Sequence, residues 1–419
     1  MSAANVEDRI GLEAGEHTAW GELATGWPTL LGATAAVSTG ATLFNYSATH
    51  FAKSIQDDFG WTRAEVAGGL TMTLVASAVL LPLMGWLTDR FGSLRVGGLG
   101  LIGYGATILG LSSIPGELWI YYCVMAILSL FYASTSAVTL APLVAARFKA
   151  RRGLALGVMM SGPAMVMVAF SPLLANLIET MGWRAGYIAM GAGAFLIGLP
   201  GLYLATRSSG QLVREDRSGS SGFTLPEALR TTTYWKMVAG VILSTWAIGG
   251  FLNQYALLLA DKAFTPTQIG LLGSVFVAMV LVGRTAVGFL LDQRNPRLVA
   301  LLAMVGAAIG ALLMLQTEPS FATSAIFLGL IGCGMGAEGD IQAFFTARQF
   351  GLKNFSTIFG TMAMLTAAGM GLGAFSFGKL HDLNGSYTVA IWTATGCLVC
   401  AALLFGSLPR EKATFPPKA

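Results

Sequence analysis

Long runs of apolar residues, separated by short charged stretches, divide the sequence into twelve segments. Each run is about as long as the roughly 20 residues that a helix needs to cross the hydrocarbon core of a bilayer. Only helices and closed barrels satisfy their backbone hydrogen bonds in lipid, so the pattern predicts a bundle of spanning helices. The expected spans are residues 27–50, 64–88, 95–113, 118–146, 153–178, 185–205, 236–260, 267–291, 298–316, 321–347, 355–379 and 386–408.

The composition agrees with a membrane protein and excludes several other classes. Charged residues make up 11% of the chain and hydrophobic residues 54%, whereas soluble domains carry roughly 25% charged residues. The four cysteines lie in apolar segments without metal-ligand spacing, so we expect no disulfide, no metal site and no cofactor. The chain has no phosphate-binding loop of the kind that ATPases use. The net charge of +4 is no signal for nucleic-acid binding.

The positions of lysine and arginine predict the orientation of the spans. With both termini in the cytoplasm, 19 of the 25 basic residues fall on the cytoplasmic side, as the positive-inside rule requires. The Gly/Ser-rich, charged stretch at 206–235 is expected to be a cytoplasmic linker. The predicted parts are therefore a cytoplasmic tail at 1–26, six-helix bundles at 27–205 and 236–408 on either side of that linker, and a cytoplasmic tail at 409–419.

The two halves of the chain repeat each other. The loop GWLTDRFGSLR at 85–95 has a counterpart in GFLLDQRNPR at 288–297, and the acids Asp89 and Asp292 are 203 residues apart. A weaker echo links RFKARRGLALG with QFGLKNFSTIFG at nearly the same separation. Twelve spans, a central linker and a two-fold repeat are typical of a transporter whose two bundles enclose a site at the membrane midplane.

The same motifs resemble those of a known family. GWLTDRFGSLR is similar to the loop motif of the major facilitator superfamily, and within it residues 147–162 resemble the signature of monocarboxylate transporters and their bacterial oxalate/formate antiporter-like relatives. The stretches at 51–66 and 336–351 are also similar to such proteins. The signature pattern is matched by Phe148, Arg151, Arg152, Leu154, Ala155, Gly157 and Gly162.

The resemblance implies an all-α membrane protein with the major facilitator fold, twelve transmembrane helices and alternating access. It implies a secondary transporter of a small organic anion, a monocarboxylate, driven by protons or by anion exchange, in a bacterial inner membrane among membrane lipids. The family default is a monomer that binds no nucleic acid. The superfamily's loop motif implies a conformational gate at Asp89, Arg90, Arg95 and Asp292.

Two positions depart from the animal members of this family. Those members carry a lysine near the outer end of the first span, where this chain has Tyr46, and an aspartate one turn before the arginine of span 8, where it has Val280. The arginine itself is present as Arg284. Carboxylate binding therefore remains an expectation, whereas the proton-coupling scheme of the animal members does not transfer.

Arg284 is the one basic residue that falls in the interior of a predicted span, away from its ends. A charge at such depth is costly and usually faces a cavity or a partner. A guanidinium matches a carboxylate with two parallel hydrogen bonds. Arg284 is therefore the candidate anchor for a substrate carboxylate, and the alternative is a structural ion pair with an acid in span 321–347.

Glu338 and Asp340 lie in the middle of that same span, within the glycine-rich stretch GCGMGAEGD. Residues two apart on a helix point about 200° away from each other, given about 3.6 residues per turn, so both cannot face one cavity. One acid is predicted to carry the proton or to gate Arg284. The alternative is a permanent bond between helices, and the sequence leaves open which acid does what.

Weaker candidates for substrate contact are polar side chains in the first, fourth and seventh spans. The simpler interpretation of each side chain is a structural contact between helices, because polar groups at membrane depth need partners. As a set they suit a small polar ligand. They are Asn45, Tyr46, Tyr132, Asn253 and Tyr255, with Thr135, Ser136 and Gln254 beside them.

The basic loop of Arg147, Lys149, Arg151 and Arg152 is expected to anchor the chain near lipid phosphates. An alternative function with the same fold is a proton antiporter that exports hydrophobic or cationic compounds and uses Glu338 and Asp340 as cation sites. A membrane sensor is the third possibility, but the predicted tails are too short for a signalling domain.

Overall fold

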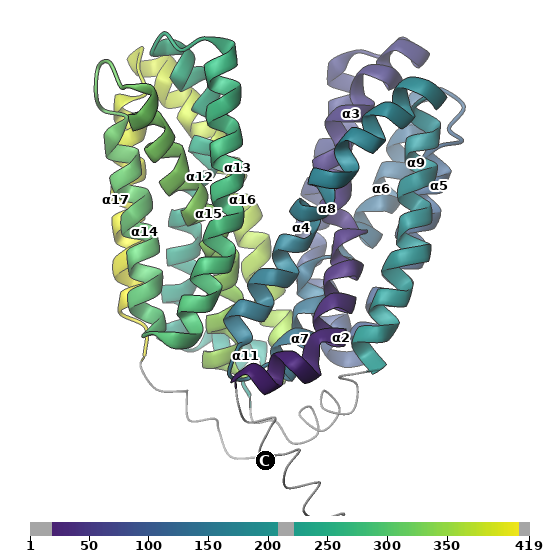
Figure 1. The fold of residues 1–419 in the computed structure, drawn as a ribbon, viewed down its shortest axis with the longest axis horizontal. Coiled ribbons are helices and arrows are strands. Elements are labelled where there is room, and N and C mark those ends of the chain that lie inside the picture. The colour runs from purple at the N-terminus through teal and green to yellow at the C-terminus, as the bar shows by residue number, and fades with distance from the viewer. Residues whose placement is uncertain (1–18, 208–221, 410–419) are drawn as a thin grey trace, which may run out of the picture. The chain divides into compact units, whose positions relative to one another are not determined.

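The computed structural model describes residues 19–207 and 222–409, which are drawn in Figure 1. Most of both predicted tails and part of the predicted linker, namely residues 1–18, 208–221 and 410–419, lie outside the described residues. The chain divides into two compact units, residues 1–220 and 221–419. We call them the N-terminal and the C-terminal unit and describe each by itself.

The N-terminal unit contains six membrane-spanning segments. Two of them are interrupted: the first is split into α2 and α3 around Thr39 and Gly40, and the fourth into α6 and α7 around Thr135 and Ser136. A short π-helical stretch, Ala194–Gly198, continues α9 within the span Trp183–Arg207. The helices are α2 (Ala19–Ser38), α3 (Ala41–Phe59), α4 (Arg63–Phe91), α5 (Ser93–Leu111), α6 (Leu118–Ser134), α7 (Ala137–Arg147), α8 (Arg152–Met181) and α9 (Trp183–Gly193).

The two interruptions meet inside this unit. Ala41, the first residue of α3, donates its backbone N–H to Thr135 Oγ1 over 3.0 Å. The first N–H groups of a helix have no partner within the helix, so this bond satisfies one of them. A Cβ added at Gly40 would lie 2.7 Å from the Cβ of Thr135, so glycine allows the two interruptions to approach this closely.

The C-terminal unit contains six spanning helices, and they are continuous. Thr265 and Gln268 form a capping box that starts α13, with Pro266 at its first position. The helices are α12 (Thr232–Asp261), α13 (Pro266–Gln293), α14 (Pro296–Leu313), α15 (Phe321–Phe350), α16 (Phe355–Asn384) and α17 (Thr388–Gly406).

The predicted linker is partly helical. The short helix α11 (Leu225–Leu229) and the first turn of α12 both lie within residues 206–235. Thr224 and Glu227 form a capping box, which explains why a polar stretch begins a helix here. This start signal is visible in the sequence as Thr-Leu-Pro-Glu.

Among the described residues, eleven helical segments are long and apolar enough to cross a membrane. The interrupted pair α2 and α3 occupies the place of the first predicted span, which completes twelve. The prediction of an all-α protein with twelve spans in two six-helix bundles is confirmed. The difference lies in the first and fourth spans, each of which is divided into two helices within one apolar run.

Glycines bring α13 and α15 close together in the C-terminal unit. A Cβ added at Gly332 would lie 2.6 Å from the carbonyl oxygen of Phe276, and one added at Gly336 would lie 2.9 Å from the backbone nitrogen of Arg284. Contacts between backbones at this distance leave no room for side chains. The middle of α15 is therefore fixed against the part of α13 that carries Arg284.

Candidate functional site

The two acids of α15 are both buried, with Glu338 5% and Asp340 1% exposed. They lie against different helices. Asp340 is one turn after Gly336, so both are on the face of α15 that packs against α13. Glu338 contacts α12 instead, where its Oε1 lies 3.0 Å from Ser244 Oγ.

Asp340 and Arg284 form the charged part of the site. The guanidinium of Arg284 acts electrostatically on the Asp340 carboxyl group, and Arg284 is half-buried. Neither carboxylate oxygen of Asp340 has a hydrogen-bond partner among the described residues. A buried acid without hydrogen bonds is costly, and a nearby cation is the group that offsets this cost here.

Ser244 is a residue of this site that the sequence did not reveal. It is fully buried on α12 and lies between Glu338 and the carbonyl oxygen of Val241, 3.1 Å from the latter. A serine within an apolar helix carries no signal of its own. Its partner is 94 residues away, and nothing in a single sequence links the two.

The other predicted residues of the C-terminal unit lie on α12. The amide of Asn253 donates to the carbonyl oxygen of Gly249 on its own helix over 2.9 Å, and its side chain is exposed. The ring of Tyr255 stacks on Phe276 with the centroids 6.3 Å apart. Neither residue contacts Arg284 in the interactions that the structure records.

In the N-terminal unit, Asn45 and Tyr46 are exposed on α3, with 42% of Tyr46 accessible. Tyr132 on α6 is half-buried and within electrostatic range of Tyr46. The structure therefore brings these two tyrosines near each other. They stay predicted substrate contacts.

The predicted gate residues lie at helix ends. Asp89 and Arg90 are in the last turn of α4, where Arg90 lies over the ring of Trp86, 5.3 Å from its centroid. Arg95 is exposed in the first turn of α5, and Asp292 is in the last turn of α13.

Glu22 is a second residue that sequence reasoning missed, because it fell in a predicted tail. Its carboxylate is 9% exposed and accepts backbone N–H groups from Lys149, Ala150 and Arg151 at 2.9 to 3.2 Å. Arg151 is only 8% exposed. The expectation that this whole loop lies among lipid phosphates is therefore wrong for Arg151, because α2 covers the loop.

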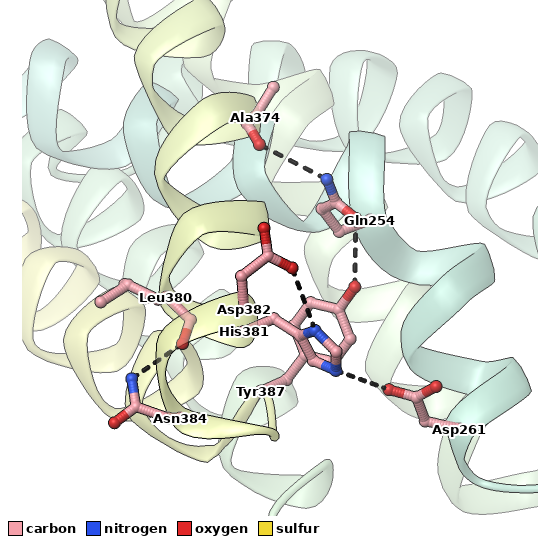
Figure 2. A network of polar contacts seen from close by, with 8 residues as sticks. All are labelled: Gln254, Asp261, Ala374, Leu380, His381, Asp382, Asn384 and Tyr387. Atoms are coloured by element: carbon pink, nitrogen blue, oxygen red, sulfur yellow. Dashed lines mark hydrogen bonds and ion pairs between the residues drawn. The ribbon is translucent and has the colours of Figure 1, made fainter.

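A polar network joins three helices at the end of the C-terminal unit where α12 ends (Figure 2). His381 Nε2 on α16 lies 3.2 Å from Asp261 Oδ2 on α12, and its Nδ1 is 3.8 Å from Asp382. Tyr387, which precedes α17, packs its ring 4.5 Å from that of His381 and donates its hydroxyl to Gln254 Oε1.

Comparison of the sequence with known proteins finds similar proteins that are named as transporters of carboxylates. Monocarboxylate transporter 13 of Bos taurus is 26% identical over 267 residues, which is 62% of this chain and 61% of that protein. Monocarboxylate transporter 1 of Mus musculus is 21% identical over 90% of this chain and 83% of its own length. The oxalate:formate antiporter of Oxalobacter formigenes is 29% identical over 45% of each chain.

Solved structures share the fold at low sequence identity. The proton:xylose symporter XylE bound to 6-bromo-6-deoxy-D-glucose superposes with a TM-score of 0.67, at 12% identity over 94% of this chain and 97% of that one. A bacterial homologue of the iron transporter ferroportin gives a TM-score of 0.67 at 14% identity, over 91% and 98%.

The sequence profile described as Major Facilitator Superfamily matches residues 30–374, most of the chain. The matched region extends over both units, and the similar transporters and solved structures support the same family. The chain belongs to the Major Facilitator Superfamily of multi-pass membrane transporters.

Proposed function

We propose that this protein moves a small organic anion, a monocarboxylate, across the bacterial inner membrane together with a proton, by alternating access. The observation that carries the proposal is the half-buried Arg284 beside the buried Asp340, both inside one spanning unit. Relatives named as monocarboxylate transporters and as an oxalate:formate antiporter support an anionic substrate.

Arg284 supplies the anion site in this proposal. Its guanidinium can donate two parallel hydrogen bonds to a carboxylate, and in an apolar interior this pairing is stronger than in water. The close backbone contact at Gly336 fixes α13 against α15, so the arginine is held at a defined depth. A positioned cation inside the membrane recruits a single carboxylate without any cofactor.

Asp340 couples the anion to the proton. When a substrate carboxylate takes the guanidinium, Asp340 loses the cation that offsets its buried charge. An isolated carboxylate is too costly in an apolar interior, so the group binds a proton instead. The loaded unit then carries the anion and the proton together, and the net charge that crosses the membrane is zero.

Glu338 has a different role because it contacts Ser244 on α12. In this proposal the two acids take the two alternatives that the sequence leaves open. Asp340 is assigned to coupling with Arg284, and Glu338 to the contact between α12 and α15.

Uptake of a panel of labelled carboxylates into proteoliposomes tests the anion site. With an inward proton gradient, we expect uptake of one or more monocarboxylates and a loss of at least roughly 30-fold in Arg284→Gln, because removing one partner of a buried charge pair costs about 2 kcal/mol or more. Arg284→Lys should restore part of it, since a lysine keeps the charge but not the planar fork.

Arg294→Gln is the matched control, because Arg294 is exposed just after α13. It should transport as wild type does. Normal uptake by Arg284→Gln would contradict the proposal. Uptake or export of hydrophobic cations in place of carboxylates would favour the exporter of the same fold.

A further inference from the structure

The contact between Ser244 and Glu338 has a counterpart in the other half of the chain. Ala41 precedes Ser244 by 203 residues, and Thr135 precedes Glu338 by the same number, which is also the separation of Asp89 and Asp292. Ala41 donates to Thr135 over 3.0 Å, Ser244 lies 3.0 Å from Glu338, and each pair is 94 residues apart. In each unit, the first and fourth spans therefore contact each other at equivalent positions of the repeat.

The chemistry of the two contacts differs. In the N-terminal unit the bond runs from a backbone N–H to the Thr135 hydroxyl, which in turn donates to the carbonyl oxygen of Tyr132, three residues earlier, over 3.1 Å. The Ala41 N–H and the Thr135 hydroxyl proton both have acceptors, and neither group is ionisable in the ordinary pH range. In the C-terminal unit the contact contains a carboxyl group.

Counting protons at Ser244 shows which form of that carboxyl group fits. The hydroxyl has one proton and lies within hydrogen-bond distance of two oxygens, Val241 O at 3.1 Å and Glu338 Oε1 at 3.0 Å. If Ser244 donates to the carbonyl three residues earlier, as Thr135 does, Glu338 must bring a proton of its own. If Glu338 is ionised, Ser244 must turn away from the Val241 carbonyl.

In the described part of the chain, Glu338 forms no ion pair. Arg284 on α13 acts on Asp340, the other acid of α15. The remaining charged residues of the helices packed around α15 are near helix ends or one or two turns from them: Lys236 and Asp261 on α12, Asp292 on α13, Arg297 on α14, Arg348 on α15, and Lys379, His381 and Asp382 on α16. Ser244 is the one hydrogen-bond partner of the Glu338 carboxyl group in the described part of the chain.

A second pair of acids at equivalent positions has basic partners of different kinds. Asp58, near the end of α3, and Asp261, the last residue of α12, are again 203 residues apart. Asp58 accepts from Arg184 over 2.7 Å, whose charge is permanent. Asp261 pairs with His381 instead (Figure 2), and histidine is charged only when protonated.

The groups around His381 are carboxylates and a phenol. Asp261 faces it from α12, Asp382 from its own helix, and Tyr387 from the start of α17. The neighbouring cations are Lys379, two residues earlier on α16, and Lys262, whose ammonium donates to the carbonyl oxygen of Gln316. Protonation of the imidazole therefore creates an attraction between α12 and α16 that its neutral form lacks.

We propose that the C-terminal unit is the proton-responsive half of this transporter, with Ser244 as the positioning residue that holds a protonated Glu338 between α12 and α15, and with the Asp261–His381 pair as a second proton-dependent contact. In the N-terminal unit, the contact at the position of Ser244 and Glu338 contains no carboxyl group, and Asp58 pairs with an arginine, whose own charge is permanent. The proposal deepens the proposed function, because it locates the response to protons in one unit.

Infrared difference spectra of the purified full-length protein test the Glu338 contact without any substrate. At neutral pH we expect a band from a buried carboxylic acid that Glu338→Gln removes and Asp340→Asn retains. Ser244→Ala should shift its frequency, whereas Ser274→Ala should not, because Ser274 is on α13 and bonds only its own helix. A band unchanged in Glu338→Gln or in Ser244→Ala would overturn the proposal.

Thermal unfolding tests the His381 contact against its counterpart. The stability lost in His381→Gln should be larger in acid than in base, because only the protonated imidazole carries a charge that attracts Asp261. The loss in Arg184→Gln should not grow on mild acidification, because the arginine keeps its charge. Equal pH dependence in the two variants would overturn this second contact. Because neither experiment uses substrate, failure here is distinguishable from normal uptake by Arg284→Gln, which would overturn the anion site.

Discussion

The two units of this protein are built from one repeated pattern, yet they place polarity differently. In the N-terminal unit the first and fourth spans are interrupted. The backbone groups at these helix ends form hydrogen bonds between spans, as in the bond from the Ala41 N–H to Thr135. The C-terminal unit keeps the corresponding helices α12 and α15 continuous and places side-chain acids at the same register. The comparison shows how a repeat diverges in chemistry while keeping its geometry.

The divergence has a physical consequence for transport. Backbone groups and hydroxyls have no charge to lose, so a proton or ion does not change the charge state of contacts made from them. Carboxyl groups in an apolar interior respond strongly to a nearby cation or proton. A unit with acids at these helix contacts can change them when an ion or proton arrives, whereas the contact between Ala41 and Thr135 contains no group that responds in this way.

The largest expected effect is at Gly336, where the C-terminal unit needs a glycine and the N-terminal unit has Ala133 at the position 203 residues earlier. A Cβ at Gly336 would lie against the backbone of Val280 and Arg284. We expect Gly336→Val to cost about 3 kcal/mol or more of folding free energy, because backbone cannot move aside as a side chain can.

Thermal stability of purified protein checks this prediction. Gly371→Val on α16 is the control, since no atom lies within 4 Å of a Cβ added there. If both variants unfold at the same temperature, the close contact between α13 and α15 does not exist and the position of Arg284 is not fixed in this way.

A smaller loss of stability is expected at the contact between Ala41 and Thr135 in the N-terminal unit. Thr135→Val removes the acceptor for the Ala41 N–H and leaves a buried donor unpaired, at a cost of about 1–3 kcal/mol. Thr135→Ser should restore most of the stability because it keeps the hydroxyl. Thr107→Val is the control, since Thr107 bonds only the carbonyl of Gly103 on its own helix. The loss should not depend on pH, and a pH-dependent loss would break the comparison between the units.

The smallest effect is expected at the Asp58–Arg184 pair. Hydrogen bonds from Arg184 and then Trp183 lower the pKa of Asp58. A lowered pKa means that the pair contributes stability at neutral pH and loses it as the pH falls through the folded pKa. Both side chains are more than 40% exposed, so Asp58→Asn should cost less than about 1 kcal/mol.

Unfolding followed against pH measures this contribution. The difference between wild type and Asp58→Asn should vanish in acid. Asp261→Asn should show the opposite trend down to mildly acidic pH, because His381 becomes a charged partner only on acidification. Parallel trends in the two variants would mean that the contacts are not chemically distinct.

The fold could be predicted from the sequence because its signals are local and repeated. Apolar runs and basic loops indicate the spans, and Arg284, Glu338 and Asp340 are recognisable because charges are rare in such runs. The interruption at Gly40 was missed, because an apolar run reads as one helix whether or not it is broken. The partners of the acids were missed for another reason. Ser244 and Glu338 are 94 residues apart, and a side chain's neighbour on another helix leaves no mark on the local pattern.

Asp340→Asn in proteoliposomes tests the central claim most directly, with the proton flux and the anion flux measured together. An asparagine cannot bind or release a proton, but it leaves the anion site at Arg284 in place. The account predicts that exchange of labelled for unlabelled anion persists in Asp340→Asn, while uptake no longer follows a proton gradient and no protons enter with the anion. Proton-driven uptake at the wild-type ratio in this variant would contradict the account.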